Sequence, residues 1–256
     1  MQNRIYLGND LVHWSGGEAR EKHPDCPAAL RFAHRVLHAA EFAVLERIRS
    51  LGPVAWSKAL WGLWAAKEAV YKAAMKAVPE LTFSPSSIQV FAAAEKFIQG
   101  VAIDGWARVK DSYYGIRWET NENFVHAVAI GPLEQTLVQD VDSTEYSSLW
   151  QKVQFRIDRH EAILADGWQG ICDGAHAASQ AVRRLACAIA AKLPGLQDAS
   201  LGIEREMLMS GRLAPPRLTA FRQGVNCGGD AALAVRKIDV SLSHDGPWSA
   251  AAVLPV

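Results

Sequence analysis

Residues 60–77, with the sequence LWGLWAAKEAVYKAAMKA, constrain the fold of this chain more than any other stretch. They are rich in strong helix formers and contain no proline, and Pro79 lies just beyond them, where a helix is expected to stop. The apolar side chains recur with the period of a helix that packs on a core, at Leu60, Leu63, Trp64, Ala66, Val70 and Ala74. Against that face stand Lys67, Glu68 and Lys72. Because Glu68 and Lys72 are four residues apart, they form either a solvated surface pair or part of a site.

Composition limits the classes to which the protein can belong. Half of the 256 residues are hydrophobic, and the formal net charge is zero, so no global field favours nucleic acid or an anionic membrane. The four cysteines have neither metal-knuckle nor redox-motif spacing, and we expect free thiols in a reducing compartment. The first residues carry no apolar signal core, and no apolar run approaches the length of a membrane span. We therefore expect a cytoplasmic protein.

The order of the predicted elements indicates an α+β fold with an internal duplication. Each half has an alanine-rich helix, at residues 60–77 and 174–193, followed by strands that end in a small-residue strand. We predict two pseudo-twofold-related halves, each an antiparallel sheet packed on a long helix. The predicted division is a first lobe at residues 1–131, a linker at 132–152 and a second lobe at 153–256. A cleft between two such lobes is where a ligand usually binds.

Two further segments bear on a site in the first half. A strand is predicted through residues 5–12, and it contains Asp10, an acid flanked by apolar residues. Such an acid is costly to bury unless it is paired or binds a metal; the alternative is an Asx-type turn at residues 8–10. Residues 28–49 are strongly helical, either as one helix or as two helices broken near His38, and Arg31 and Arg35 form a small basic patch there.

Three short elements together resemble the 4′-phosphopantetheinyl transferases. These elements are residues 8–10 (GND), 64–72 (WAAKEAVYK) and 241–244 (SLSH). That family typically shows a Gly-Ile-Asp strand, a Trp-Ser-x-Lys-Glu-x-x-x-Lys helix and a Ser-Leu-Ser-His strand. Residues 31–41 (RFAHRVLHAAE) are also similar to a helix of the small holo-acyl-carrier-protein synthase branch.

The order of these elements departs from the two-lobed, surfactin-synthetase-activating type, in which the Ser-Leu-Ser-His lobe comes first. The chain therefore resembles either a swapped-lobe transferase or a tandem fusion of two small synthase units. Val12 stands where the two-lobed type has a second acid, and His13 stands where the small synthases have one. Ala65 replaces the usual Ser, Thr or Cys, and residues 175–177 (AHA) lack a basic residue often found there.

The resemblance implies transfer of the 4′-phosphopantetheine arm of coenzyme A to a serine of an apo acyl or peptidyl carrier protein, with release of 3′,5′-ADP. Asp10 and Glu68 would bind Mg²⁺, which prefers oxygen ligands. Glu68, or a water that it orients, would be the base, and Lys72 would hold a phosphate or steady developing charge. The resemblance further implies contacts with coenzyme A from Lys67, Arg183, Arg212, Ser243 and His244.

Several of these residues also have a purely structural interpretation. His244 can be a turn histidine beside Asp245, Arg212 a solvated loop residue, and Arg183 part of an ordinary helix surface. The basic patch at Arg31 and Arg35 is predicted to dock an acidic carrier protein, and the chain is predicted to act as a monomer with pseudo-dimeric lobes. The alternatives to an enzyme are a non-catalytic relative that binds a carrier protein or coenzyme A, and an α+β scaffold that matches the motifs by chance.

Overall fold

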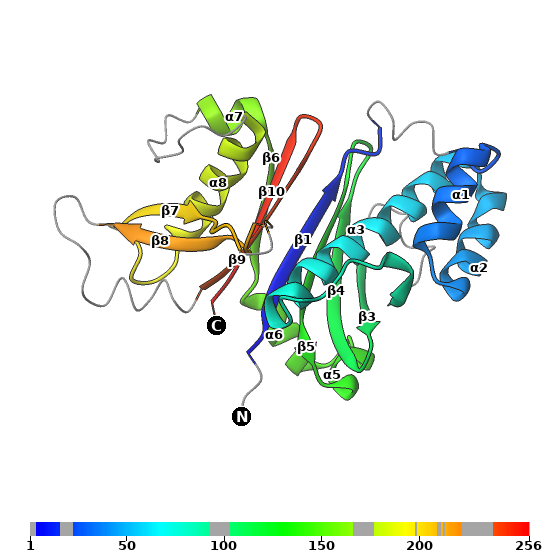
Figure 1. Cartoon of the computed structure of the whole chain (residues 1–256), viewed down its shortest axis with the longest axis horizontal. Helices are drawn as coiled ribbons and strands as arrows, with labels where there is room; N and C mark the ends of the chain where they lie inside the picture. The colour runs from blue at the N-terminus through cyan, green and yellow to red at the C-terminus, as the bar shows by residue number, and fades with distance from the viewer. Residues whose placement is uncertain are drawn as a thin grey trace. The chain divides into compact units, whose positions relative to one another are not determined.

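The computed structural model describes residues 4–15, 23–92, 103–165, 177–197, 199–208, 211, 213–221 and 238–255. The chain divides into two compact units, Met1–Ser147 and Ser148–Val256 (Figure 1). This division falls inside α6 (Thr144–Gln151) and within the predicted linker. Within the described ranges, no helix is long and apolar enough to cross a membrane.

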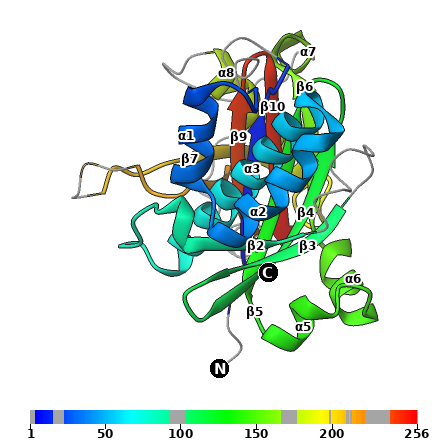
Figure 2. The same cartoon turned by 90° about the vertical axis from the view of Figure 1, so that its right-hand side faces the viewer.

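The first unit is an antiparallel sheet with one long helix across it. Its five strands have the order β1-β5-β4-β3-β2. Their bounds are β1 Tyr6–Val12, β2 Ile88–Phe91, β3 Ile103–Val109, β4 Ser112–Thr120 and β5 Val125–Leu133. The long helix is α3 (Pro53–Ala77), which packs on β1 and β5, with α1 (Pro27–Val36) and α2 (Ala39–Ile48) beside its first half (Figures 1 and 2). Short 3₁₀ turns, η2 (Arg49–Leu51) and η3 (Pro85–Ser87), complete this part of the unit.

The helix α3 packs closely on the sheet because its buried face is lined mainly by alanine. Ala59, Ala65, Ala66, Ala69 and Ala73 are fully buried there. Trp118 of β4 fills the space beside them and donates its indole N–H to the Gly62 carbonyl oxygen of α3 at 2.9 Å. The buried side chains of α3 and the sheet form one apolar core, which is the main source of stability for such a layer.

The second unit repeats the same plan with a smaller sheet. Its three-stranded sheet has the order β6-β10-β9, with β6 Gln154–Arg159, β9 Ile238–Asp245 and β10 Trp248–Pro255. The helix α8 (Ala177–Ala190) packs on it, and the short α7 (His160–Ala165) lies beside α8. A separate two-stranded sheet pairs β7 (Ser200–Glu204) with β8 (Arg217–Phe221).

Both units share one topology. In each, the first strand pairs antiparallel with the last strand, and the last strand pairs antiparallel with the one before it: β1-β5-β4 and β6-β10-β9. In each, the helix that packs on this sheet follows the first strand in sequence. The predicted α+β class, with an antiparallel sheet on a long helix in each half, is confirmed.

Most predicted elements appear, with several differences. The central helix begins at Pro53, not at residue 60, and the predicted break near His38 separates α1 from α2. Residues 6–12 form a strand, so the alternative Asx turn at residues 8–10 is wrong. The stretch at 132–148, in which no element was predicted, contains α5 (Gln135–Gln139) and the start of α6.

Candidate active site on the first unit

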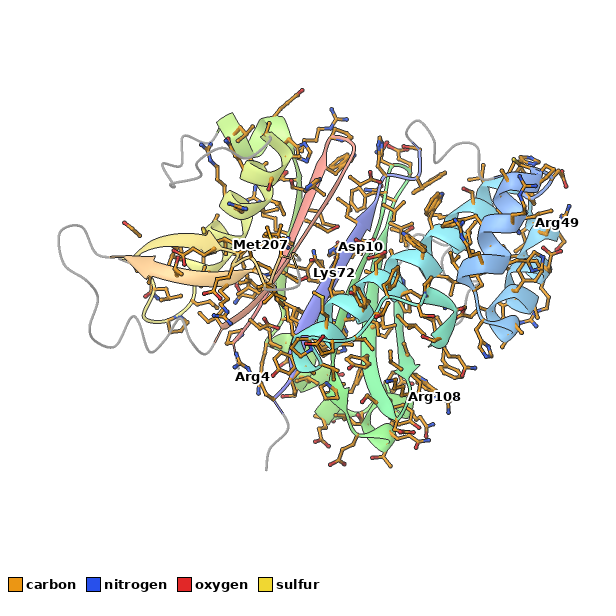
Figure 3. All side chains as sticks on the ribbon, in the orientation of Figure 1. Arg4, Asp10, Arg49, Lys72, Arg108 and Met207 are labelled. Atoms are coloured by element: carbon orange, nitrogen blue, oxygen red, sulfur yellow. The ribbon has the colours of Figure 1, made fainter. Side chains whose placement is uncertain are left out.

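An acid of β1 and a lysine of α3 meet where the helix crosses the strand. Lys72 donates to the Asp10 Oδ1 at 2.7 Å and to the Asn9 carbonyl oxygen at 3.0 Å (Figure 3). One turn further along α3, Lys76 donates to the Leu7 carbonyl oxygen at 2.6 Å. Asp10 is only 8% exposed, so its charge depends on this ammonium rather than on water.

Glu68 adds a second carboxylate to this pair. It is half-buried and lies one helical turn before Lys72, on the same side of α3. Burial first, and then the negative charge of Asp10, raise the pKa of Glu68 to about 7, against the opposing effect of the Lys72 ammonium. The two carboxylates therefore repel each other electrostatically, and Lys72 compensates their negative charge only in part.

A glycine permits this close contact between strand and helix. A Cβ atom at Gly8 would lie 1.9 Å from the Ala69 carbonyl oxygen and 2.7 Å from the Ala73 nitrogen, both backbone atoms of α3. No real Cβ makes such contacts, so any other residue at position 8 would push α3 away from β1. The glycine of the GND motif thus sets the distance at which Asp10 and Lys72 meet.

The donor set is compatible with Mg²⁺ held by two protein ligands. Two carboxylates are hard oxygen donors, and the pKa of Glu68 is raised mainly by burial and then by the negative charge of Asp10, both of which a bound cation would offset. Within the described residues, no group of three or more His, Cys, Asp or Glu side chains could hold a metal. Val12, at the position of the missing second acid, is buried in the apolar core. The remaining ligands of a Mg²⁺ ion would thus be water and phosphate oxygens.

Lys67 lies apart from this cluster. The prediction that it shares the polar face of the helix with Glu68 and Lys72 is wrong, because its side chain is 0% exposed and points into the unit. Its ammonium donates to Glu41 of α2 and to the carbonyl oxygens of Pro85 and Ile88. All three of its N–H donors have acceptors inside the first unit.

The other predicted ligands of coenzyme A belong to the second unit. Ser243 is buried in β9, and the neighbouring His244 is exposed, with its ring centroid 6.3 Å from that of His160. Arg183 of α8 is half-buried, and Arg212 lies outside the described residues. Arg205, which lies just after β7 and was not singled out in the sequence, has an exposed side chain, and desolvation and the charge of Arg183 lower its pKa. That these residues share a ligand with Glu68 stays a prediction.

A family model described as the 4′-phosphopantetheinyl transferase superfamily matches residues 6–129. The first unit is therefore similar to this superfamily. The match spans Asp10, Glu68 and Lys72, which the geometry brings together, and also the α1 patch with Arg31 and Arg35. No curated protein matches the chain. The similarity to the superfamily therefore rests on the unit that contains the carboxylates. The second unit lies outside the match and shares only the topology of the first.

Proposed function

We propose that this protein transfers the 4′-phosphopantetheine arm of coenzyme A to a serine of an apo carrier protein and releases 3′,5′-ADP. The observation that supports this most is the cluster of Asp10, Glu68 and Lys72 on the superfamily-matched unit. It combines a partly protonatable carboxyl group, a second carboxylate and an ammonium, which are the groups that a phosphoryl-group transfer between oxygens requires.

In the proposed reaction, Glu68 or a water that it orients accepts the proton of the carrier serine. A carboxylate with a pKa of about 7 suits this task, because general bases work best near the operating pH. The serine oxygen forms a bond to the phosphorus that bears the pantetheine, and the bond from that phosphorus to 3′,5′-ADP breaks. Lys72 balances the charge that develops on the pyrophosphate oxygens. Mg²⁺, held by Asp10 and Glu68, would supply Lewis-acid neutralisation of the pyrophosphate when bound.

We also propose that the carrier protein docks on α1. Arg31 and Arg35 are exposed there, and the first turn of α1 has no acidic residue. The Arg35 guanidinium lies 5.8 Å from the ring centroid of Phe32, whose ring is 5.2 Å from that of Trp64 on α3. Trp64 is one turn before Glu68 on the same side of α3. This basic and aromatic surface thus adjoins the carboxylates and suits a partner with an acidic and apolar helix.

The second unit is proposed to bind the nucleotide end of coenzyme A through Ser243 and His244, with Arg183 and Arg212 as further phosphate contacts. The exposed His244 offers an imidazole for phosphate oxygens, and the buried Ser243 precedes it in β9. In this proposal one chain supplies both the acids and the nucleotide contacts, so a monomer is sufficient.

The test is whether an apo carrier protein gains the mass of a phosphopantetheine arm when it is incubated with this protein, coenzyme A and Mg²⁺. We expect the gain with wild type, its loss on addition of a chelator, and its loss with Glu68→Gln. The matched control is Glu80→Gln, the same change at an exposed glutamate just beyond α3, which should leave the gain unaltered.

A non-catalytic binding protein is the second candidate, and the apolar Val12 at the position of the second acid favours it. That candidate predicts calorimetric binding of coenzyme A without any mass gain on the carrier. If the protein neither binds coenzyme A nor transfers the arm, both candidates are refuted.

A further inference from the structure

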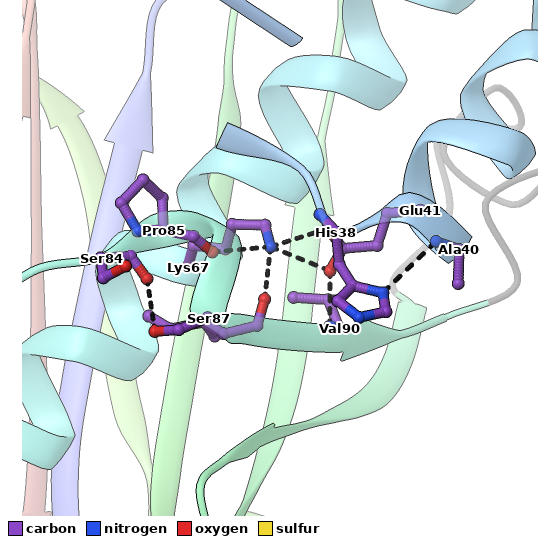
Figure 4. Close-up of polar contacts among 9 residues, drawn as sticks. His38, Ala40, Glu41, Lys67, Ser84, Pro85, Ser87 and Val90 are labelled. Carbon is purple, nitrogen blue, oxygen red and sulfur yellow. Dashed lines mark hydrogen bonds and ion pairs between the residues drawn. The ribbon is translucent and has the colours of Figure 1, made fainter. Parts of the chain in front are cut away.

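A fully buried ion pair joins α3 to α2 and β2 next to the candidate site. The Lys67 ammonium lies 2.7 Å from the Glu41 Oε2 and 2.9 Å from its Oε1 (Figure 4). It also donates to the Pro85 carbonyl oxygen at 3.0 Å and to the Ile88 carbonyl oxygen. The side chains of the pair are 0% and 3% exposed. Lys67 thus joins α3 to two segments that are distant in sequence, α2 and residues 85–88.

Glu41 is held as firmly as its partner. Its Oε2 accepts the His38 backbone N–H at 2.7 Å, which completes the capping box at the start of α2. Its Oε1 accepts the Val90 backbone N–H of β2 at 2.6 Å (Figure 4). One carboxylate therefore caps a helix, binds a strand and neutralises Lys67.

This arrangement excludes Lys67 from direct contact with a phosphate in the folded unit. Burial lowers the pKa of Lys67, and the charge of Glu41 opposes that effect. Removing one member of a buried pair leaves the other charge uncompensated, which is strongly destabilising. To reach a ligand, Lys67 would have to leave four acceptor atoms, two on Glu41 and two on residues 85–88, at once.

The position of the pair along α3 suggests what it does. Lys67 immediately precedes Glu68, and it ties this turn of α3 to α2 and β2. Lys72 and Lys76 tie the following turns of the same helix to the backbone of β1. The turn that bears Glu68 is thus held by α2 and β2 through Lys67, and the turns that follow it are held by β1 through Lys72 and Lys76.

We infer that Lys67 and Glu41 form a positioning pair that sets the placement of Glu68 relative to Asp10, and that Lys67 is not a ligand of coenzyme A. This inference rests on the proposed transferase function. A small displacement of a catalytic group, of about 1 Å, can cost on the order of 100-fold in rate. Loosening the pair should therefore reduce turnover without weakening the binding of coenzyme A.

The experiment compares kcat, the KM for coenzyme A and the calorimetric Kd of coenzyme A in four variants. Lys67→Met removes the ammonium at similar volume, and Glu41→Gln loosens the pair at a residue too deeply buried to bind a substrate. The double variant Glu41→Gln/Lys67→Met removes both charges. Lys58→Met is the matched control, because Lys58 is a partly buried lysine of the same helix that lies outside the pair.

We expect kcat to fall about 10- to 100-fold in Lys67→Met and in the milder Glu41→Gln, while the KM and Kd for coenzyme A stay within about two-fold of wild type. Lys58→Met should match wild type in all three. The double variant should regain thermal stability relative to Lys67→Met, because no buried charge is left unpaired, but it should not regain kcat.

Three results would overturn the inference. A rise in the Kd of coenzyme A with kcat retained in Lys67→Met would make Lys67 a ligand. Recovery of kcat together with stability in the double variant would show that the pair only keeps the unit folded, as would wild-type kcat in Glu41→Gln. An inactive wild type would instead refute the proposed function, and with it the reaction that the pair is inferred to serve. Should Lys67→Met not fold, Glu41→Gln still decides between these outcomes.

Discussion

The two units share a topology but differ in what their first strand presents to its helix. In the first unit, β1 carries Asp10, which pairs with Lys72 of α3. In the second unit, β6 carries Asp158, which pairs instead with Arg156 of the same strand. The helix α8 has the sequence AASQAVRRLACAIA and contains arginines but no acid. The same scaffold thus carries an ion pair between strand and helix in the first unit and an ion pair within the first strand of the second, so the chemistry follows particular side chains and not the fold.

The largest expected effect tests whether the acid in the first strand matters in one unit only. We expect Asp10→Asn to lower kcat/KM for carrier modification by about 100- to 1,000-fold, because it removes a charge from the reacting centre. Asp158→Asn, the same change in the corresponding strand of the second unit, should stay within about three-fold of wild type. The comparison fails if the two variants lose activity equally.

A second prediction concerns the contact between strand and helix. Gly8→Ala should lower the free energy of unfolding by about 3 kcal/mol, since its Cβ would meet the Ala69 carbonyl oxygen at 1.9 Å. Chemical denaturation would measure this loss. A stability unchanged from wild type would show that α3 can move away from β1 at little cost, and that Gly8 does not fix the distance between Asp10 and Lys72.

The pH dependence of stability should report the shifted carboxyl group of the first unit. The pKa of Glu68 is about 7 in the folded protein against an ordinary value of 4.5, so the folded state binds more protons between these values. Its contribution to stability is therefore present below pH 4.5 and declines as pH rises through 7. We expect wild type to lose about 1–2 kcal/mol relative to Glu68→Gln over this window without Mg²⁺. Parallel curves for the two proteins would contradict the shift.

Charge reversal on α1 should have a smaller effect that is confined to the carrier. Arg31→Glu/Arg35→Glu is expected to raise the KM for an acidic carrier protein about 3- to 10-fold, since complementary charge mainly speeds association. The KM for coenzyme A should not change. Arg156→Glu, a charge reversal on the second unit, serves as the control. Equal effects of the two reversals on the carrier KM would place the docking surface elsewhere.

The last prediction is that mixing two inactive variants restores no transferase activity. It tests whether one chain supplies both kinds of unit to one reaction. Glu68→Ala damages the first unit and His244→Ala the second. If the monomer is the active form, a mixture of the two inactive variants should stay inactive, because every molecule retains one damaged half. Activity approaching the level of a shared intersubunit site would show that units from different chains work together.

The sequence predicted that Asp10 and Glu68 lie near each other, but not how they are held; their roles stay predictions. Both were singled out because acids in apolar surroundings need compensation, and periodicity alone defined the buried face of α3. Periodicity assigned Lys67 to the wrong face, because its partner Glu41 lies 26 residues away and no local pattern joins them. The sequence also could not show that position 8 requires glycine, because the requirement comes from backbone atoms of a helix more than 60 residues later.

The bonds from Lys72 and Lys76 to β1 have a consequence for how this site tolerates substitution. Besides Asp10, these lysines contact the carbonyl oxygens of Asn9 and Leu7. Every amino acid, proline included, supplies a carbonyl oxygen, so these two bonds do not depend on which residue occupies positions 7 and 9. Related chains can therefore keep the same helix-to-strand attachment while their residues at these positions diverge. The attachment depends on the two lysines and on the intervening Gly8, and a comparison of the other strand residues alone would overlook it.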